Sequence, residues 1–200
     1  MPSAIILLAD GIEEVEALAP VDVLRRAGVD VTLACPGESL DLTGRNNVRL
    51  CAETHFEDCA DNLYNMVIIP GGPGHTRLKE NPAVLAFLQR HAGAGCFTCA
   101  ICAGPTVLKE AGLLEGRAYT AHPSVATKLP DLDPDRDVVR DGSVITSTRP
   151  CAGKRRRRRS ASPFAPDPQP AGAASLALFN STGLKRKRFP VFVSRIMIRE

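Results

Sequence analysis

The chain has 200 residues, seven cysteines and a formal net charge of +3 at pH 7. This length allows one compact domain with its own hydrophobic core and an appended segment. The odd cysteine count, with no basic leader ahead of the first apolar run, predicts reduced thiols, a cytoplasmic location and no secretion. No apolar run approaches the roughly 18 residues that a membrane span needs, so no membrane association is expected.

The charge is divided unevenly along the chain. Residues 151–200 contain twelve Lys and Arg against two acidic residues, whereas residues 1–150 contain 13 basic and 20 acidic residues. The C-terminal stretch is also rich in Pro, Ala and Ser, a composition that cannot bury enough apolar surface to order itself. The sequence therefore predicts an acidic folded domain over residues 1–150 and a basic, disordered tail over residues 151–200.

The first elements alternate between strand and helix. Residues 4–9 form a continuous apolar run, which is typical of a central parallel strand. Residues 12–18 predict one or two helical turns, and Pro20 should restart a helix that ends at Gly28. Residues 29–34 predict a second strand.

The same alternation continues through the middle of the chain. Residues 48–51 predict a short strand, and residues 65–70 predict a buried strand that runs into the glycine-rich stretch 71–74. Residues 82–92 have helical spacing, and residues 95–101 predict another buried strand. Each of these strands is followed by a turn or a helix, as expected of a parallel sheet.

The last predicted elements close the domain. Residues 117–120 predict a strand that leads to His122, and residues 137–146 predict a hairpin whose Asp141-Gly142 pair forms a type I′ turn. Strands alternating with helices predict an α/β fold, with a mostly parallel sheet and helices on both faces.

Cys102 lies where the strand 95–101 turns into a helix that contains Val107 and Leu108. A side chain on such a tight bend is held exposed, and the unpaired amides of the first helical turn favour negative charge. Because the thiolate is the reactive form of cysteine, this position favours a nucleophilic or redox-active Cys102. The alternative is a small buried hydrophobic residue.

Two more strand ends supply polar groups. The glycine amides of the stretch 71–74 can form an anion-binding concavity, and one of them could join the Ala103 amide in an oxyanion hole, although a glycine pair is more often only a turn. Glu13, Glu14 and Glu16 follow the first strand and are most simply a solvated helix start. If Glu16 points into the site, we expect it to be protonated and to donate to the Cys102 sulfur, because two neighbouring anions would raise both pKa values.

His122 and two more cysteines have competing interpretations. His122 could act as a general acid or base, or be a surface histidine at a strand end. The spacing of Cys96, Cys99 and Cys102 could suggest a metal or iron–sulfur site. Residues three apart in a strand point to opposite faces and no fourth ligand follows, so we expect packing cysteines, as for Cys35 and Cys59, and no metal or cofactor.

Five short motifs occur in an order that resembles the DJ-1/PfpI superfamily, with the best match to its Parkinsonism-associated DJ-1 branch. They are Asp10-Gly11-Ile12-Glu13-Glu14-Val15-Glu16, residues 20–28, Ile69-Pro70-Gly71-Gly72, Ala100-Ile101-Cys102-Ala103-Gly104-Pro105 and His122-Pro123. The resemblance covers residues 3–147 and implies a flavodoxin-like three-layer fold that usually forms a homodimer.

The resemblance also implies roles for single residues. Cys102 matches the reactive, oxidisable cysteine, Glu16 its hydrogen-bonded carboxylic acid, and His122 a nearby histidine. Gly72 and Ala103 match the positions whose amides form the oxyanion hole. Three further residues match positions linked to the dimer: Asp22, which would reach the partner's histidine, and Arg45 and Cys51 near the interface.

The implied activity is a cofactor-free glyoxalase or deglycase that acts on methylglyoxal, glyoxal or their early adducts on proteins and nucleotides. A non-catalytic redox sensor or chaperone that responds to oxidative stress through Cys102 is the alternative. Peptidase activity is the weaker interpretation, because the protease-like branch has a histidine where this chain has Ala103.

The C-terminus departs from the family pattern. Residues 148–153 and a following arginine block replace the expected Gly-Pro-Gly turn and closing helix. We expect the closing helix to be missing, which would expose apolar sheet and cost roughly 8–12 kcal/mol, and we expect a frameshift or splice variant as the origin of the tail. The basic clusters 154–159 and 185–188 could instead serve as a nuclear signal or a nucleic-acid patch.

Overall fold

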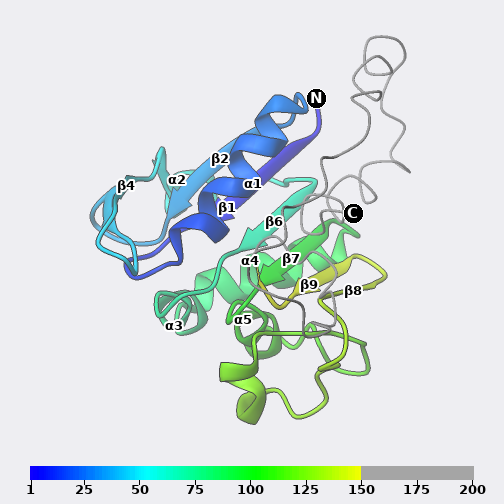
Figure 1. Ribbon diagram of the computed structural model, residues 1–200. Coiled ribbons are helices and arrows are strands. Elements are labelled where there is room, and N and C mark those ends of the chain that lie inside the picture. The colour runs from blue at the N-terminus through cyan, green and yellow to red at the C-terminus, as the bar shows by residue number, and fades with distance from the viewer. Residues whose placement is uncertain (150–200) are drawn as a thin grey trace, which may run out of the picture.

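A computed structural model describes residues 1–149 of the chain, in which one seven-stranded sheet forms the centre (Figure 1). Its strand order is β5-β2-β1-β6-β7-β9-β8. All neighbouring pairs are parallel except β8 and β9, which form an antiparallel hairpin at one edge. The strands are β1 (Ser3–Leu7), β2 (Asp30–Cys35), β5 (Thr54–His55), β6 (Met66–Ile69), β7 (Phe97–Ile101), β8 (Val138–Asp141) and β9 (Val144–Ser147).

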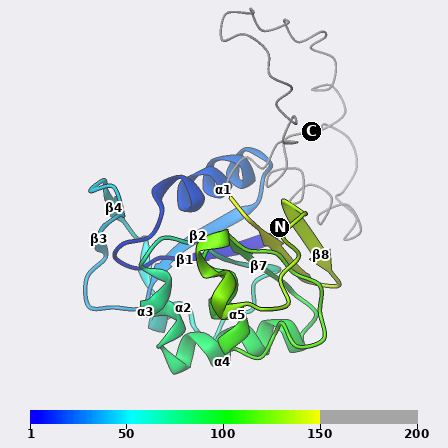
Figure 2. The same cartoon turned by 60° about the horizontal axis from the view of Figure 1, so that its bottom comes forward.

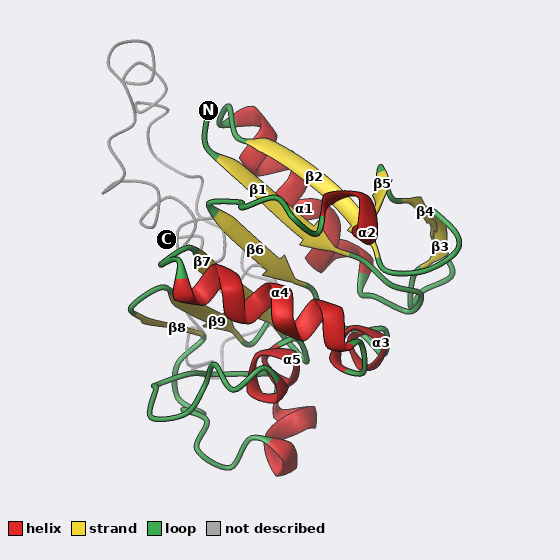
Figure 3. Cartoon of the chain, turned by 180° about the vertical axis from the view of Figure 1, so that it is seen from behind, coloured by secondary structure: helices red, strands yellow, loops and turns green. Residues whose placement is uncertain are grey.

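Helices cover both faces of this sheet. The helix α1 (Glu14–Arg26) lies on one face, over β1 and β2 (Figure 1). Seen from behind, α2 (Phe56–Cys59), α4 (Pro82–Gly93) and α5 (Pro105–Glu110) lie on the other face (Figure 3). The flavodoxin-like α/β sandwich expected from the sequence is thus confirmed for residues 1–149.

The central strands form the core because their residues are apolar on both faces. Residues 4–7 of β1 and all four residues of β6 are almost completely buried. The helix α4 begins where the Asn81 side chain accepts hydrogen bonds from the amides of Ala83 and Val84, at 2.9 and 3.3 Å. Pro82 follows at the first helical position, where a missing amide hydrogen has no cost.

Smaller elements lie outside the central sheet. The helix α3 (His75–Lys79) follows β6, and a 3₁₀ helix spans Pro123–Lys128. The strands β3 (Asp41–Thr43) and β4 (Arg49–Cys51) form a separate hairpin that projects from the body of the domain (Figure 2). The sequence did not reveal β3, β5, α2 or α3, which are all short.

The prediction that Pro20 restarts a helix is wrong. The helix α1 runs from Glu14 to Arg26 without a break, and Pro20 lies buried inside it. A proline at this position removes one hydrogen bond to the carbonyl of Glu16. Packing of Ala17, Val21 and Leu24 into the core evidently outweighs that loss.

Two predictions near the end of the domain are also wrong. Residues 117–120 form no strand, because β9 occupies the position beside β7 and the Thr120 amide donates to the Thr146 side chain instead, at 2.9 Å. In the following hairpin Asp141 pairs with Val144, so the turn residues are Gly142 and Ser143. Gly142 has φ of +60° and Ser143 has no positive φ, which fits a type II′ turn rather than type I′.

The predictions for the tail, including its disorder and the missing closing helix, lie outside the described residues. Within residues 1–149 no helix is long and apolar enough to cross a membrane.

Candidate active site

Cys102 lies at the carboxyl end of β7, on a strained turn. Its φ is +60°, a left-handed conformation that residues other than glycine rarely adopt. Two backbone hydrogen bonds hold it there: its amide donates to Ser147 at 2.8 Å, and its carbonyl accepts from His122 at 2.9 Å. The neighbouring strand and the loop before the 3₁₀ helix thus fix the direction of the cysteine side chain.

The loop after β6 approaches Cys102 closely, and only glycine permits this approach. A Cβ atom on Gly71 would lie 2.7 Å from the Cys102 Cβ atom and 2.6 Å from Glu16 Oε2. Gly72 has φ of +79°, and a Cβ atom on it would lie 2.6 Å from the Gly11 carbonyl oxygen. The glycine pair therefore brings backbone amides next to the thiol.

Hydrogen bonds orient those amides. The Glu13 amide donates to the Gly71 oxygen at 3.1 Å, which fixes the plane of the Gly71–Gly72 peptide. The amides of Gly72 and Ala103 lie close enough to the Cys102 sulfur to lower its pKa. Two amide donors that converge on a nucleophile can also stabilise an oxyanion that forms next to it.

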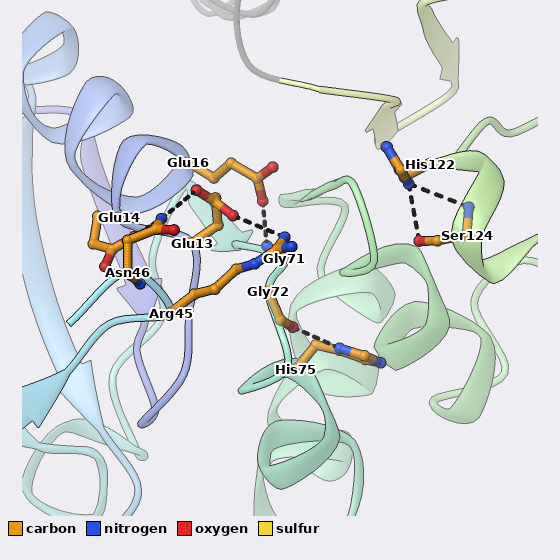
Figure 4. A network of polar contacts seen from close by, with 10 residues as sticks. All are labelled: Glu13, Glu14, Glu16, Arg45, Asn46, Gly71, Gly72, His75, His122 and Ser124. Carbon is orange, nitrogen blue, oxygen red and sulfur yellow. Dashed lines mark hydrogen bonds and ion pairs between the residues drawn. The ribbon is translucent and has the colours of Figure 1, made fainter. Parts of the chain in front are cut away.

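Glu16 lies beside the same sulfur. Its carboxylate accepts a hydrogen bond from the Gly71 amide at 2.8 Å (Figure 4), and it lies close enough to the Cys102 side chain for each group to shift the pKa of the other. Burial is the main cause that raises the pKa of Glu16, and the amide of Gly71 only partly opposes it. A carboxyl group in this environment retains its proton to a higher pH than an exposed glutamate.

The expectation of a thiolate at Cys102 does not hold while Glu16 is ionised. Burial first, and then the Glu16 carboxylate, raise the pKa of Cys102 to about 12, although the amides of Ala103 and Gly72 lower it. Both groups thus resist a second negative charge. The pair shares at least one proton at neutral pH, and its titration belongs to the two groups together.

The prediction of a solvated acidic helix start is wrong for Glu14 and Glu16, which are both buried. Glu14 accepts from the Asn46 amide at 2.7 Å and from the Asn46 side chain at 2.8 Å. Burial acts to raise the pKa of Glu14, but these and other amide hydrogen bonds lower it overall. Glu13 is partly exposed and pairs with Arg45 at 3.1 Å (Figure 4).

His122 is joined to Cys102 through the backbone, but its imidazole contacts Ser124. Its Nδ1 accepts from the Ser124 hydroxyl at 2.9 Å and from the Ser124 amide at 3.2 Å (Figure 4). Since Nδ1 accepts, a neutral imidazole carries its proton on Nε2. Figure 4 shows His122 apart from the Glu16 network. Because Ser124 occupies Nδ1, any proton transfer by His122 would have to use Nε2.

The three residues that the sequence linked to a dimer lie on α1 and around the projecting hairpin. Asp22 pairs with Arg26 of the same helix at 2.8 Å, and both side chains are exposed. Cys51 is exposed on β4, and its thiol donates to the Ala52 carbonyl at 3.3 Å. Arg45 is the one of the three that borders the site, through Glu13.

Three features of the site escaped the sequence. Asn46 binds two glutamates, the Gly71 amide binds Glu16, and His75 binds the Gly72 carbonyl at 2.7 Å. The contact between His75 and Gly72 had a signal in the sequence, because a side chain at the start of a helix can reach the backbone three residues before it. The other two contacts join residues 32 to 55 positions apart, and no local pattern announces them.

The remaining cysteines do not gather around Cys102 as ligands. Cys35, Cys59 and Cys99 are buried in the core, as expected of packing residues. Burial raises the pKa of Cys99 to about 12. Among residues 1–149 no group of three or more His, Cys, Asp or Glu side chains is placed to hold a metal ion.

Comparison with known proteins gives consistent matches to one group. The family described as "DJ-1/PfpI family" matches residues 2–155. The "Parkinson disease protein 7 homolog" of Danio rerio is 38% identical over 153 residues, which cover 74% of this chain and 81% of that protein. The "Glutathione-independent glyoxalase DJR-1.2" of Caenorhabditis elegans is 35% identical with the same coverage of both chains.

Other matches differ in length or add a structure. "Protein DJ-1 homolog A" of Arabidopsis thaliana is 37% identical over 152 residues, and this chain spans 39% of its length. The crystal structure of Drosophila melanogaster DJ-1beta has a TM-score of 0.71 and 34% identity, and the match covers 74% of this chain and 81% of that one.

Proposed function

This chain belongs to the DJ-1/PfpI family, and from that membership and the geometry around Cys102 we propose that it is a cofactor-free, cysteine-dependent glyoxalase or deglycase. Its substrates would be methylglyoxal or glyoxal and their early adducts on proteins or nucleotides. The observation that carries the proposal is the convergence of one carboxyl group and two amides on the Cys102 sulfur. The relative named as a glutathione-independent glyoxalase supports the same reaction class.

The first step is addition of the Cys102 sulfur to the aldehyde carbon of methylglyoxal. As the carbon–sulfur bond forms, the carbonyl π electrons move to oxygen, and the amides of Gly72 and Ala103 stabilise that oxyanion. The thiol proton passes to Glu16 when this carboxyl is ionised. If the single proton of the pair starts on Glu16, the sulfur attacks as the thiolate and Glu16 donates that proton to the new oxyanion.

The later steps convert this hemithioacetal to lactate without an external oxidant. The proton on the former aldehyde carbon moves through an enediol to the neighbouring carbon, which leaves a thioester on Cys102. Water then hydrolyses the thioester to lactate and the free thiol, so the net change is addition of one water molecule. Glu16 is the acid–base group nearest to these atoms, and His122 Nε2 is a second candidate.

The test is lactate production from methylglyoxal by three proteins: the full chain, Cys102→Ser and Cys99→Ser. We expect activity in the full chain and in Cys99→Ser, and its loss in Cys102→Ser. Cys99 is the matched control because it is a buried cysteine in the middle of β7, the strand that leads to Cys102. Equal activity in both variants would refute a role for Cys102.

The second candidate is a redox sensor or chaperone in which oxidation of Cys102 changes partner binding. The Glu16 carboxyl group, whose pKa is raised mainly by burial, favours this candidate because in its protonated form it can donate to a sulfinate oxygen. Mild peroxide followed by intact-mass analysis should then add two oxygens at Cys102 while no lactate forms. Both candidates need a free thiol, which fits a reducing compartment such as the cytoplasm.

We also propose a homodimer through α1 and the β3–β4 hairpin. Three large apolar side chains are exposed there: Val15 (54%), Leu18 (42%) and Val48 (48%). Asp22 lies on α1, Cys51 lies on β4, and Arg45 lies in the turn between β3 and β4. Sedimentation analysis should show a dimer for the full chain and a shift to monomer for Leu18→Glu; a monomeric full chain would exclude this interface.

A further inference from the structure

His75 is placed to control the amide donor of Gly72. It is the first residue of α3, and its imidazole Nδ1 lies 2.7 Å from the Gly72 carbonyl oxygen (Figure 4). The backbone amide of His75 donates to the same oxygen at 3.2 Å. One carbonyl therefore receives two hydrogen bonds from a single residue, and one of them depends on the side chain.

The geometry fixes the protonation of the ring. A carbonyl oxygen can only accept, so Nδ1 must carry a hydrogen and Nε2 is the unprotonated nitrogen of the neutral ring. The half-buried position lowers the pKa of His75, mainly through loss of hydration. The Nδ1–H donor to Gly72 is present in both the neutral and the charged form of the ring.

Gly72 needs such a restraint because a glycine has no Cβ atom to limit its backbone. Its φ of +79° is one of several conformations that glycine adopts readily. The peptide before it is fixed by the Glu13 amide, which donates to the Gly71 oxygen. The carbonyl after it is fixed by His75, so the amide that faces the Cys102 sulfur belongs to a residue restrained on both sides.

We propose that His75 is a positioning residue: by holding the Gly72 carbonyl, its side chain aims the Gly72 amide at the Cys102 sulfur and at the oxyanion formed there. The effect on turnover rests on the proposed function, whereas the effect on the thiol does not. His75 touches no reacting atom in this arrangement, and it acts through the backbone of Gly72.

The experiment compares the full chain with His75→Asn, His75→Leu and His75→Ala. Asparagine places an N–H donor two bonds from Cβ, where histidine has Nδ1, and leucine and alanine have no donor. His55→Leu is the matched control, since His55 Nδ1 makes the same contact to a glycine carbonyl, Gly37, at 2.9 Å on the distant β5. The readouts are site-resolved alkylation of Cys102 by iodoacetamide and the kcat and KM for methylglyoxal.

Complete removal of one oxyanion donor costs about 10²–10³ in kcat, so a misaimed donor should cost about tenfold. We expect His75→Leu and His75→Ala to slow Cys102 alkylation and to lower kcat with little change in KM. His75→Asn should restore both to within about twofold of the full chain, and His55→Leu should change neither.

Two results would overturn the proposal. Alkylation of Cys102 at the full-chain rate in folded His75→Leu or His75→Ala would show that the side chain does not aim the amide. Impairment of His75→Asn equal to that of the donor-free variants would show that ring packing matters instead. If the full chain itself forms no lactate, the proposed activity fails, and the alkylation rates still decide the role of His75.

Discussion

At the scale of single residues, the unit of chemistry is the Cys102–Glu16 pair. Burial raises the pKa of both groups, and the Glu16 carboxylate raises the pKa of Cys102 further, whereas the Cys102 side chain lowers the pKa of Glu16. The amides of Gly72 and Ala103 act in the opposite sense on the sulfur. A pair that keeps one proton can lose it from the sulfur at attack and return it from the carboxyl group later, which neither residue could do alone.

Glu16→Gln separates the two roles of that carboxyl group. Glutamine cannot transfer a proton, so lactate formation should fall by about 10²–10⁴-fold. Glutamine also carries no negative charge to raise the pKa of the thiol, so alkylation of Cys102 at pH 7 should persist or become faster. Glu110→Gln, at the end of α5, is the control and should behave like the full chain. Undiminished turnover in Glu16→Gln would rule out this acid–base role.

Gly71→Ala tests the close approach of the backbone. The added methyl group would lie 2.6 Å from Glu16 Oε2 and 2.7 Å from the Cys102 Cβ atom, so one of them must move. Because displacement by about 1 Å can cost about 10²-fold in rate, turnover should fall by at least tenfold. Gly93→Ala has no atom within 4 Å of the new methyl group and should retain full turnover. Equal rates for the two variants would contradict the geometry described for Gly71.

At the scale of elements, the site is made where three segments meet at the carboxyl ends of the central strands. The turn after β7 carries Cys102, the loop after β6 carries the glycines, and the start of α1 carries Glu16. Backbone hydrogen bonds join them: the Gly74 amide donates to Gly11 at 3.0 Å, and the Glu13 amide donates to Gly71. The positions of the strand ends in the sheet thus determine where these three segments meet.

Two threonines on neighbouring strands test how polar groups are accommodated in the sheet. The Thr98 hydroxyl on β7 is completely buried and makes no hydrogen bond within the described residues. Thr98→Val should therefore raise the free energy of unfolding by about 1 kcal/mol. Thr146→Val on β9 removes the acceptor of the Thr120 amide and should lower it by about 1–3 kcal/mol. Urea unfolding measures both, and equal destabilisation by both variants would contradict this account.

Strongly apolar elements were predictable, and weakly patterned ones were not. The strands β1 and β6 are buried on both faces and appear in the sequence as nearly continuous apolar runs, and the run of β7 is interrupted only by Thr98. Residues 117–120 have a weaker apolar pattern, with Arg117 and Thr120 at their ends, and the place beside β7 is taken by β9. Pro20 likewise favours a break in the helix, but the packing of α1 against the core outweighs this local preference.

At the scale of the whole molecule, a buried histidine makes stability depend on pH. His91 of α4 is completely buried: its Nδ1 donates to the Phe87 carbonyl at 2.8 Å, and its Nε2 accepts the Tyr64 amide at 3.0 Å. Burial is the main cause that lowers the pKa of His91 below 6.5. When the pH falls through 6.5, the unfolded chain takes up a proton that folded His91 resists, so stability decreases.

The corresponding variant is His91→Gln. Between pH 7.5 and 5.5 the full chain should lose about 1 kcal/mol more unfolding free energy than this variant, since each unmatched proton contributes up to about 1.4 kcal/mol per pH unit. His55→Gln, which changes a partly exposed histidine, should keep the dependence of the full chain. The measurement is urea unfolding at several pH values, and identical slopes in all three proteins would exclude His91 as the cause.

The position of the site was predictable because parallel strands place their carboxyl ends together, which identified the turn at Cys102 and the glycines before α3. The electrostatic state of the site was predictable only in part: the sequence suggested a protonated Glu16 beside the thiol, but only if Glu16 points into the site. Glu14 and Glu16 look like solvated helix residues in the sequence, and their burial depends on Asn46 and Gly71, which join them only in the folded chain. The same long-range contacts decide that the thiol shares a proton instead of being a free thiolate.

The central claim, that Cys102 bonds to the substrate, is tested most directly by competition at the sulfur. Iodoacetamide alkylation of each cysteine is followed by mass spectrometry while the methylglyoxal concentration is increased. We predict that alkylation of Cys102 slows with a half-maximal concentration equal to the KM for lactate formation, whereas exposed Cys51 shows no protection at that concentration. Alkylation of Cys102 at an unchanged rate, under methylglyoxal concentrations that saturate turnover, would contradict the account.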